Sequence, residues 1–261
     1  MNRLAVCIVL LVSLPALAQE SGRKISAPLA FFEDADVTMP GVLSVSHDFS
    51  YGSVTAGHDL AFPGTYVSLG LNSRLDISGG TSYVRSQFED FRVNGIGDTY
   101  VGMKVVLLPE EDHWFGLAVK PTLEVLGTPS VANNPLAPGR PNFLLPVMAQ
   151  KSFEQFRIYG TTGYLTRGIV FGALAFELNR WTRVTPTVVL LHGRLTRNQD
   201  IISEWGFNRS RSDILAGAAV SIAPQVSIYG NVSHSFGRTD LNSIRYQISG
   251  GVSYYFRLWE P

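Results

Sequence analysis

The sequence predicts an all-β protein: a transmembrane antiparallel up-and-down β-barrel of about twelve strands, in the outer membrane of a Gram-negative bacterium. Three observations predict this fold class. They are an N-terminal signal peptide, a series of segments in which apolar and polar residues alternate, and connections that are alternately short and long. Outer-membrane barrels combine short periplasmic turns with longer extracellular loops. A soluble β-sandwich shares the alternation within strands but has no reason to sort its loops in this way.

The chain begins with a secretory signal peptide, residues 1–18. Arg3 gives a basic start, the apolar run at residues 4–14 is too short to span a bilayer as a helix, and small residues place cleavage after Ala18. Cys7 is the only cysteine and lies in this signal, so the exported chain has no disulfide or thiolate chemistry. Because Arg3 is the signal's only charged residue, the exported chain carries 20 basic and 21 acidic residues. This balance gives no indication of nucleic acid as a partner.

Residues 19–39 are polar and irregular, and we expect them to form a periplasmic N-terminal arm that precedes a barrel at residues 40–261. No apolar run after the signal approaches the 18 residues of a transmembrane helix. Lipid offers no partners for unpaired backbone groups, so this chain can enter a membrane only as a closed barrel.

About twelve alternating runs follow one another along the chain. We expect strands near residues 41–50, 64–71, 74–86, 97–108, 113–127, 142–152, 154–164, 168–179, 182–194, 211–222, 225–237 and 243–257. Tight connections are expected at residues 72–74, 109–112, 152–154, 179–181 and 223–225, and the longer ones at 51–63, 87–96, 128–141 and 195–210. This alternation of short and long connections is what distinguishes the barrel from a sandwich.

The phase of each run assigns one face to lipid and the other to the lumen, because side chains alternate across a strand. In the last run, Tyr246, Ile248 and Val252 share the apolar face, and Arg245 and Gln247 share the polar one. This run is the closing strand of the predicted barrel and is expected to pair with the first, near residues 42–49.

The polar phase directs charged side chains into the lumen, where they are candidates for lining a pore and biasing which solutes enter. These candidates are Asp48, Asp76, Lys104, Lys120, Glu124, Arg157, Glu177, Arg183 and Arg245. The alternative is a packed, salt-bridged interior, because side chains fill the interior of small barrels. The mixed signs favour weak ion selectivity and neutral or zwitterionic solutes, and no cofactor or metal is implied.

Two features interrupt the strand pattern. Pro121 and Pro146 lie within predicted runs, where they remove ladder hydrogen bonds and mark bulges or strand ends. The loop at residues 127–142 is rich in Pro, Asn and Gly. It folds inward as a constriction, covers the extracellular mouth, or remains a solvated loop.

The order of motifs resembles a known family. Residues 72–86 read NSRLDISGGTSYVRS, residues 95–104 read GIGDTYVGMK, and residues 250–256 read GGVSYYF. In this order the chain resembles the MetA-pathway of phenol degradation family of outer-membrane proteins. The resemblance implies a barrel associated with transport of small, often aromatic, compounds, and it supplies no catalytic residues. Five residues follow Phe256, so Phe256 or Trp259 is expected to act as the aromatic assembly signal from an internal position.

The expected function is passive transport of small solutes, aromatic or hydrophobic ones among them, with outer-membrane lipids and the barrel-assembly machinery as further partners. A structural barrel without transport activity is one alternative. A lipid-hydrolysing enzyme is another, because His192 and His234 fall in outward phase near the ends of their runs and Ser212 lies between them. A protease at the barrel mouth is a third, based on the pair His58 and Asp59.

Overall fold

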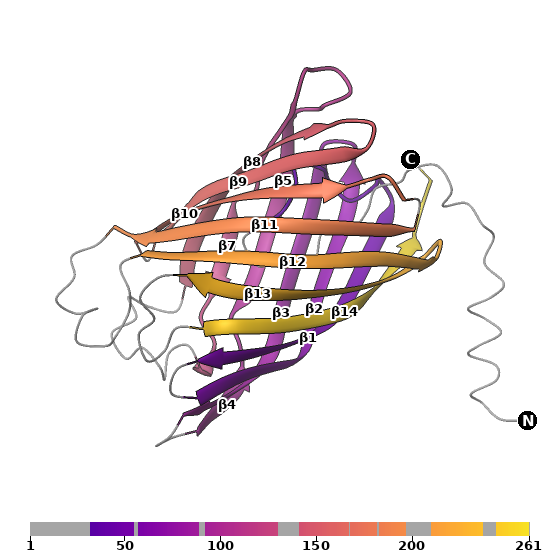
Figure 1. Cartoon of the computed structure of the whole chain (residues 1–261). Coiled ribbons are helices and arrows are strands. Elements are labelled where there is room, and N and C mark those ends of the chain that lie inside the picture. Colours follow the sequence, from indigo (N-terminus) through magenta and orange to yellow (C-terminus); the bar gives the residue numbers. More distant parts are fainter. Residues whose placement is uncertain are drawn as a thin grey trace, which may run out of the picture.

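The computed structural model describes residues 32–54, 57–88, 92–129, 141–166, 168–181, 183–196, 210–236 and 244–260. These residues form an antiparallel β-barrel (Figure 1). Its strands are β1 (Val42–Val54), β2 (Gly57–Asn72), β3 (Leu75–Phe88), β4 (Arg92–Ile96), β5 (Thr99–Leu108), β6 (Gly116–Val119), β7 (Thr122–Val125), β8 (Pro141–Ser152), β9 (Phe156–Leu165), β10 (Ile169–Leu178), β11 (Val184–Leu195), β12 (Ser210–Ala223), β13 (Val226–Phe236) and β14 (Ile244–Arg257). Within these ranges no helix is both long and apolar enough to cross a membrane. The signal peptide lies outside the described residues.

The barrel closes where the first and last strands pair, as the sequence predicts. β1 and β14 are antiparallel, with Leu43 opposite Phe256 and Asp48 opposite Gly251. β4 and β5 pair with successive parts of β3 and together take the place of one barrel strand. β6 and β7 likewise take the place of one strand, because both lie between β5 and β8. The result is a closed barrel of twelve strands with two extra strands, which confirms the predicted fold class.

A proline causes the break between β6 and β7. Pro121 has no N–H to give to the ladder and follows Lys120 in the gap between the two strands. The Lys120 N–H donates to the carbonyl of Pro146 at 3.1 Å, which keeps β8 in register past the gap. Pro121 therefore ends a strand, whereas Pro146 remains inside β8.

The connections are sorted as expected, but two of those predicted to be long are shorter. β1 runs to Val54 and β2 begins at Gly57, so most of residues 51–63 belongs to strands. His58 and Asp59 consequently lie in β2 and not in a mouth loop. Part of the predicted loop at 87–96 forms β4. Alternation alone did not reveal these extensions because Gly and Pro interrupt it. Most of the loop at residues 127–142 lies outside the described residues.

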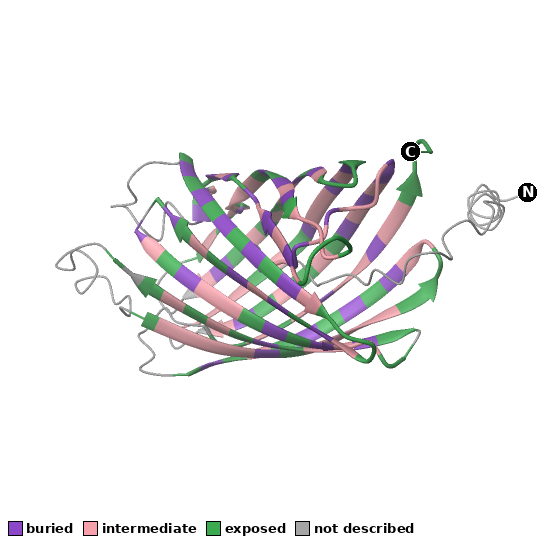
Figure 2. Cartoon of the chain, turned by 90° about the horizontal axis from the view of Figure 1, so that it is seen from above, coloured by how far each residue is buried: buried purple, intermediate pink, exposed green. Residues whose placement is uncertain are grey.

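The outer and inner faces of the barrel differ in chemistry. Buried and exposed residues alternate along the strands (Figure 2). In β8, Leu144, Met148 and Gln150 are buried inside, whereas Phe143 and Leu145 are 63% and 53% exposed on the outside. Such an exposed apolar surface suits lipid and not water.

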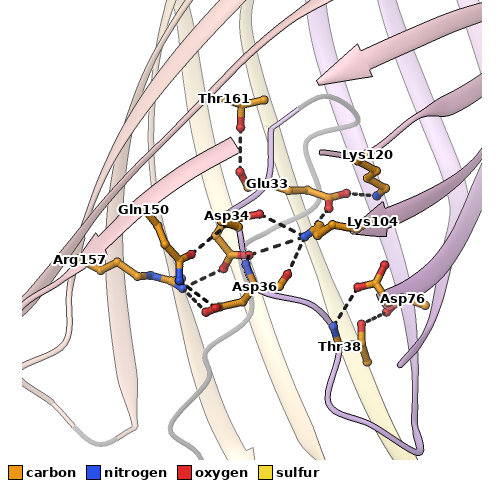
Figure 3. A network of polar contacts seen from close by, with 12 residues as sticks. Glu33, Asp34, Asp36, Thr38, Asp76, Lys104, Lys120, Gln150, Arg157 and Thr161 are labelled. Atoms are coloured by element: carbon orange, nitrogen blue, oxygen red, sulfur yellow. Dashed lines mark hydrogen bonds and ion pairs between the residues drawn. The ribbon is translucent and has the colours of Figure 1, made fainter. Parts of the chain in front are cut away.

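The N-terminal segment departs most from the sequence-based expectation. Residues 32–40, here called the inner segment, lie inside the barrel, where they contact side chains from β3, β5, β8 and β9 (Figure 3). The prediction that residues 32–39 form an arm outside the barrel is therefore wrong. The cause is pairing between the acidic residues of this segment and cationic side chains of the lumen. Residues 19–31 lie outside the described part of the chain.

Glycines let the inner segment turn into the wall and approach it closely. Gly41 has a φ of 72°, which favours glycine, and it connects the segment to β1. A Cβ at Gly70 on β2 would lie 2.1 Å from the carbonyl oxygen of Met39 and 2.2 Å from that of Thr38. The inner segment therefore packs directly against the backbone of β2 at Gly70.

Candidate functional site

Two wall lysines bind the inner segment near its start. Lys104 on β5 places its Nζ 2.8 Å from Oε2 of Glu33, and it also donates to the carbonyl oxygens of Asp34 at 3.2 Å and Asp36 at 2.8 Å. Lys120, in the gap between β6 and β7, pairs with the other carboxylate oxygen of Glu33. Both lysines are buried, so each contributes its charge in a region with little water.

Arg157 on β9 holds the next two acidic residues. Its NH1 lies 2.9 Å from Oδ2 of Asp34 and 3.2 Å from Oδ2 of Asp36. Its NH2 lies 3.2 Å from Oε2 of Glu177 on β10. The guanidinium thus bridges the wall and the inner segment. Removing one partner of a buried ion pair typically costs about 3–5 kcal/mol, so this contact fixes the position of the segment.

Neutral side chains satisfy backbone groups of the inner segment that belong to no strand. The Gln150 side chain accepts from the Ala35 N–H at 3.0 Å and donates to Asp36 Oδ1 at 2.8 Å. Thr161 donates to the Glu33 carbonyl at 2.8 Å. Because buried backbone groups need partners, these wall side chains make an irregular segment stable inside the lumen.

Further along the segment, β3 and β2 provide the contacts. Asp76 on β3 accepts from the Thr38 N–H at 2.9 Å. The Thr38 and Ser68 hydroxyls lie 2.7 Å apart. The Gly41 N–H donates to the Gly70 carbonyl at 2.9 Å, and the segment then continues into β1.

An apolar pocket of the wall receives the side chain of Phe32. The Phe32 ring stacks on that of Tyr159, with centroids 5.2 Å apart and planes at 21°. Ala175, Val189 and Leu215 complete a buried cluster around the two rings. The inner segment is therefore anchored by burial at its first described residue and by charge over the next four.

The electrostatics of Glu33 depend on the two lysines. Burial by itself would raise the pKa of the Glu33 carboxyl, but the ammonium groups of Lys104 and Lys120 lower that pKa well below its ordinary range. Glu33 is therefore ionised near neutral pH, and the ion pairs that hold the segment are intact there.

Two cavities approach the inner segment from opposite ends of the barrel. The one on the side of the short turns has a volume of about 550 Å³ and reaches Asp36, Arg157 and Glu177. The other has a volume of about 260 Å³ and reaches Glu33 and Lys120. The inner segment lies inside the lumen, and its residues line both cavities.

The structure brings six of the nine candidate pore residues together in the buried interior. Asp76, Lys104, Lys120, Glu124, Arg157 and Glu177 are all buried there, and Glu124 accepts from the Tyr100 hydroxyl at 3.0 Å. Asp48 lies further along the lumen, 3.4 Å from the Tyr229 hydroxyl. Arg183 and Arg245 are exposed near strand ends and take no part in this cluster.

Sequence reasoning missed the residues that the inner segment contributes. Glu33, Asp34 and Asp36 supply most of the negative charge that meets the wall cations. The available signal was three acids within four residues, ahead of a barrel whose predicted lumen carries several cations. The partners Gln150 and Tyr159 carry no pattern that separates them from other lumen residues.

The closed barrel, its apolar exterior and its polar interior define the class: the fold is that of an outer-membrane β-barrel. The structure is similar to the COG4313 outer membrane channel from Pseudomonas putida F1, with a TM-score of 0.64 and 11% identity over 89% of this chain and 100% of that one. It is also similar to the NanC porin, with a TM-score of 0.58 and 9% identity over 80% of this chain and 98% of that one. For the KdgM porin the TM-score is 0.54, with 12% identity over 81% of this chain and 99% of that one.

These likenesses show the shared fold, and the neighbours are channels or porins by name. No protein-family model matches the chain, and no curated protein matches it in sequence. The resemblance to the MetA-pathway of phenol degradation family therefore stays a prediction.

Proposed function

We propose that this chain is an outer-membrane channel for passive movement of small solutes. The observation that carries the proposal is the pair of cavities that reach the inner segment from opposite ends of one barrel. The segment is not part of the barrel wall, so its displacement joins the two cavities without breaking a strand. The names of the structural neighbours support the same function.

The partners of such a channel follow from its surfaces. The exposed apolar side chains of the strands contact outer-membrane lipids, and solutes contact the polar lumen. At the end of β14, the aromatic rings of Phe256 and Trp259 are exposed and are candidates for recognition by the barrel-assembly machinery.

Planar-bilayer recording of the refolded chain from Gln19 onward tests the proposal. We expect discrete conductance steps. In a Lys104→Glu, Lys120→Glu variant the reversal potential should shift toward cation preference, because two positive groups beside the inner segment become negative and repel Glu33.

The matched control is Arg183→Glu, a charge reversal of the same sign at an exposed position outside the cluster, which should leave the reversal potential near that of the wild type. Absence of conductance and of solute flux in both wild type and variant contradicts the channel function. An unchanged reversal potential would show that the two lysines do not line the path.

One contact favours a second candidate function, hydrolysis of membrane lipids. On the outer face, Nδ1 of His192 on β11 lies 2.8 Å from Oγ of Ser212 on β12, which is the distance a base and a nucleophile require. His234 on β13 lies opposite Ile214, two residues further along β12. Within the described residues, no carboxylate orients the His192 ring, and nucleophilic catalysis usually needs such a third group.

Incubation of the protein with phospholipid and lipid A substrates tests this candidate. Hydrolysis should be lost in a Ser212→Ala variant and in the His192→Ala, His234→Ala double variant. A wild-type protein without turnover removes the enzymatic alternative.

A further inference from the structure

We propose that the lumen wall beside the inner segment is a binding site for aromatic carboxylates, and that Phe32, Glu33 and Asp34 occupy it in place of such a solute. The inference rests on the proposed function, because it names the class of solute that the channel recognises. It assigns a ring-binding pocket and a neighbouring carboxylate-binding group to the same part of the wall.

The ring-binding half of the site is the pocket of Phe32. This side chain is 2% exposed and stacks against Tyr159, which is itself almost fully buried. Ala175 and Val189 close the pocket with small or branched apolar groups. Stacked aromatic pairs are favoured beyond their burial alone, so the pocket selects a flat, monocyclic ring over an aliphatic chain.

The carboxylate-binding half begins at the same tyrosine. The Arg157 guanidinium lies 4.8 Å from the Tyr159 ring centroid, and its NH1 contacts the carboxylates of Asp34 and Asp36. A guanidinium binds planar carboxylates with directed hydrogen bonds. A ring on Tyr159 and a carboxylate on Arg157 therefore lie within the reach of one small molecule.

Two further cations extend this half of the site. Lys104 and Lys120 both contact the carboxylate of Glu33, the residue next to Phe32. The inner segment thus presents an aromatic ring and adjacent carboxylates to a wall that contacts each of them, as Figure 3 shows for the charged part.

Displacement of the segment leaves these cations in need of an anion. Arg157 keeps Glu177 on NH2, but its NH1 loses Asp34 and Asp36. Lys104 and Lys120 lose Glu33. A buried charge without a partner is costly, so an incoming carboxylate stabilises the displaced state.

The wall's own acids limit how many solute charges fit. Asp76 and Glu177 remain beside the cations after the segment leaves, so a solute with one carboxylate fits better than a polyanion. Acetate fills only the charged half of the site and benzyl alcohol only the ring half. A molecule such as benzoate fills both.

The charged half of this site can be reached from either cavity. Arg157 and Asp36 line the cavity on the short-turn side, and Lys120 and Glu33 line the other. A solute that competes with the inner segment therefore does not have to cross it first.

Thiol labelling of a cysteine in the inner segment tests the competition directly. The only natural cysteine is Cys7, so a chain that starts at Gln19 has no other thiol. Ala35 is 2% exposed inside the barrel, and an Ala35→Cys thiol is protected while the segment is in place. The probe is benzoate, compared with acetate and benzyl alcohol at equal ionic strength.

We expect benzoate to raise the labelling rate by a factor of about ten when its concentration is roughly ten times its dissociation constant. Acetate and benzyl alcohol should have little effect. A Ser210→Cys thiol, on an exposed residue at the start of β12, should react at the same rate with and without benzoate.

Wall variants locate the effect. Arg157→Gln and Tyr159→Leu, each combined with Ala35→Cys, should label faster at baseline and lose the response to benzoate. Tyr159→Phe keeps the ring and should retain the response, which separates loss of the site from a general disturbance. Folding of each variant is checked by its heat-modifiable migration in gel electrophoresis.

The aromatic-carboxylate site is overturned if benzoate leaves the labelling rate unchanged, if acetate acts equally well, or if the response survives in both Arg157→Gln and Tyr159→Leu. The channel function is judged separately by conductance. If the protein conducts but shows no benzoate response, the proposed site is wrong and the channel function stands. If benzoate acts but there is no conductance or flux, the site stands and the channel function is wrong.

Discussion

At the residue scale, single side chains fix the position of the inner segment in the lumen. Arg157 links Asp34, Asp36 and Glu177, and it therefore couples the inner segment to the barrel wall. Gly70 is required for a steric reason. Only a residue without a Cβ lets the carbonyl groups of Thr38 and Met39 approach β2 so closely.

Substitution of Gly70 by Val should release the adjoining end of the inner segment. The new Cβ would fall 2.1 Å from the Met39 carbonyl oxygen, and overpacking of this kind typically costs about 1–3 kcal/mol. The labelling rate of Ala35→Cys should therefore rise by about tenfold.

Gly193→Val is the matched control, because a Cβ at Gly193 on β11 meets nothing within 4 Å. Equal labelling rates in the Gly70 and Gly193 variants would show that the close approach at β2 does not hold the segment in the lumen.

At the element scale, the strands and the inner segment follow different rules. Each strand has backbone partners on two sides, so alternation of side chains decides its two faces. The inner segment has wall side chains as its main partners, through Gln150, Thr161 and Asp76. Its place in the lumen consequently depends on a few ion pairs and one ring, and the proposed displacement of this segment would leave every strand of the barrel paired.

At the scale of the whole molecule, the barrel separates an apolar exterior from a charged interior. Leu145 near the middle of β8 is 53% exposed, whereas its neighbours Leu144 and Pro146 face inward. Lipid is the environment that suits this arrangement, because it contacts the apolar faces of the strands. Closure of the barrel pairs the backbone groups for which lipid offers no partners.

A charge on the lipid face should destabilise the barrel according to its depth. Leu145→Arg is expected to lower the free energy of unfolding in vesicles by about 2–4 kcal/mol, the cost of arginine near the bilayer midplane. Reversible denaturant titration of the refolded protein measures this change.

Leu258→Arg provides the comparison, because Leu258 is 54% exposed just beyond the end of β14. Its cost should be about 0–1 kcal/mol, as expected near an interface. If the free energy of unfolding falls by the same amount in both variants, the predicted position of the barrel in the membrane is wrong.

Local sequence determined the barrel and its lumen-facing side chains. Alternation, tight turns and loop lengths depend on residues close together in the chain, and they predicted the twelve strands and the buried positions of Lys104, Lys120 and Arg157. The sequence assigned Pro121 and Pro146 alike to bulges or strand ends, because both lack a backbone donor, and only Pro121 ends a strand.

Only the tertiary structure decided that the inner segment occupies the lumen. Lys104 and Asp36 are 68 positions apart, and Arg157 and Asp36 are 121 apart, so no local pattern pairs them. A polar, irregular run such as residues 32–39 has no periodicity and reads as an exposed arm. It lies in the barrel because the closed sheet places buried cations and the Tyr159 pocket side by side, and the acids and the Phe32 ring of the segment pair with them.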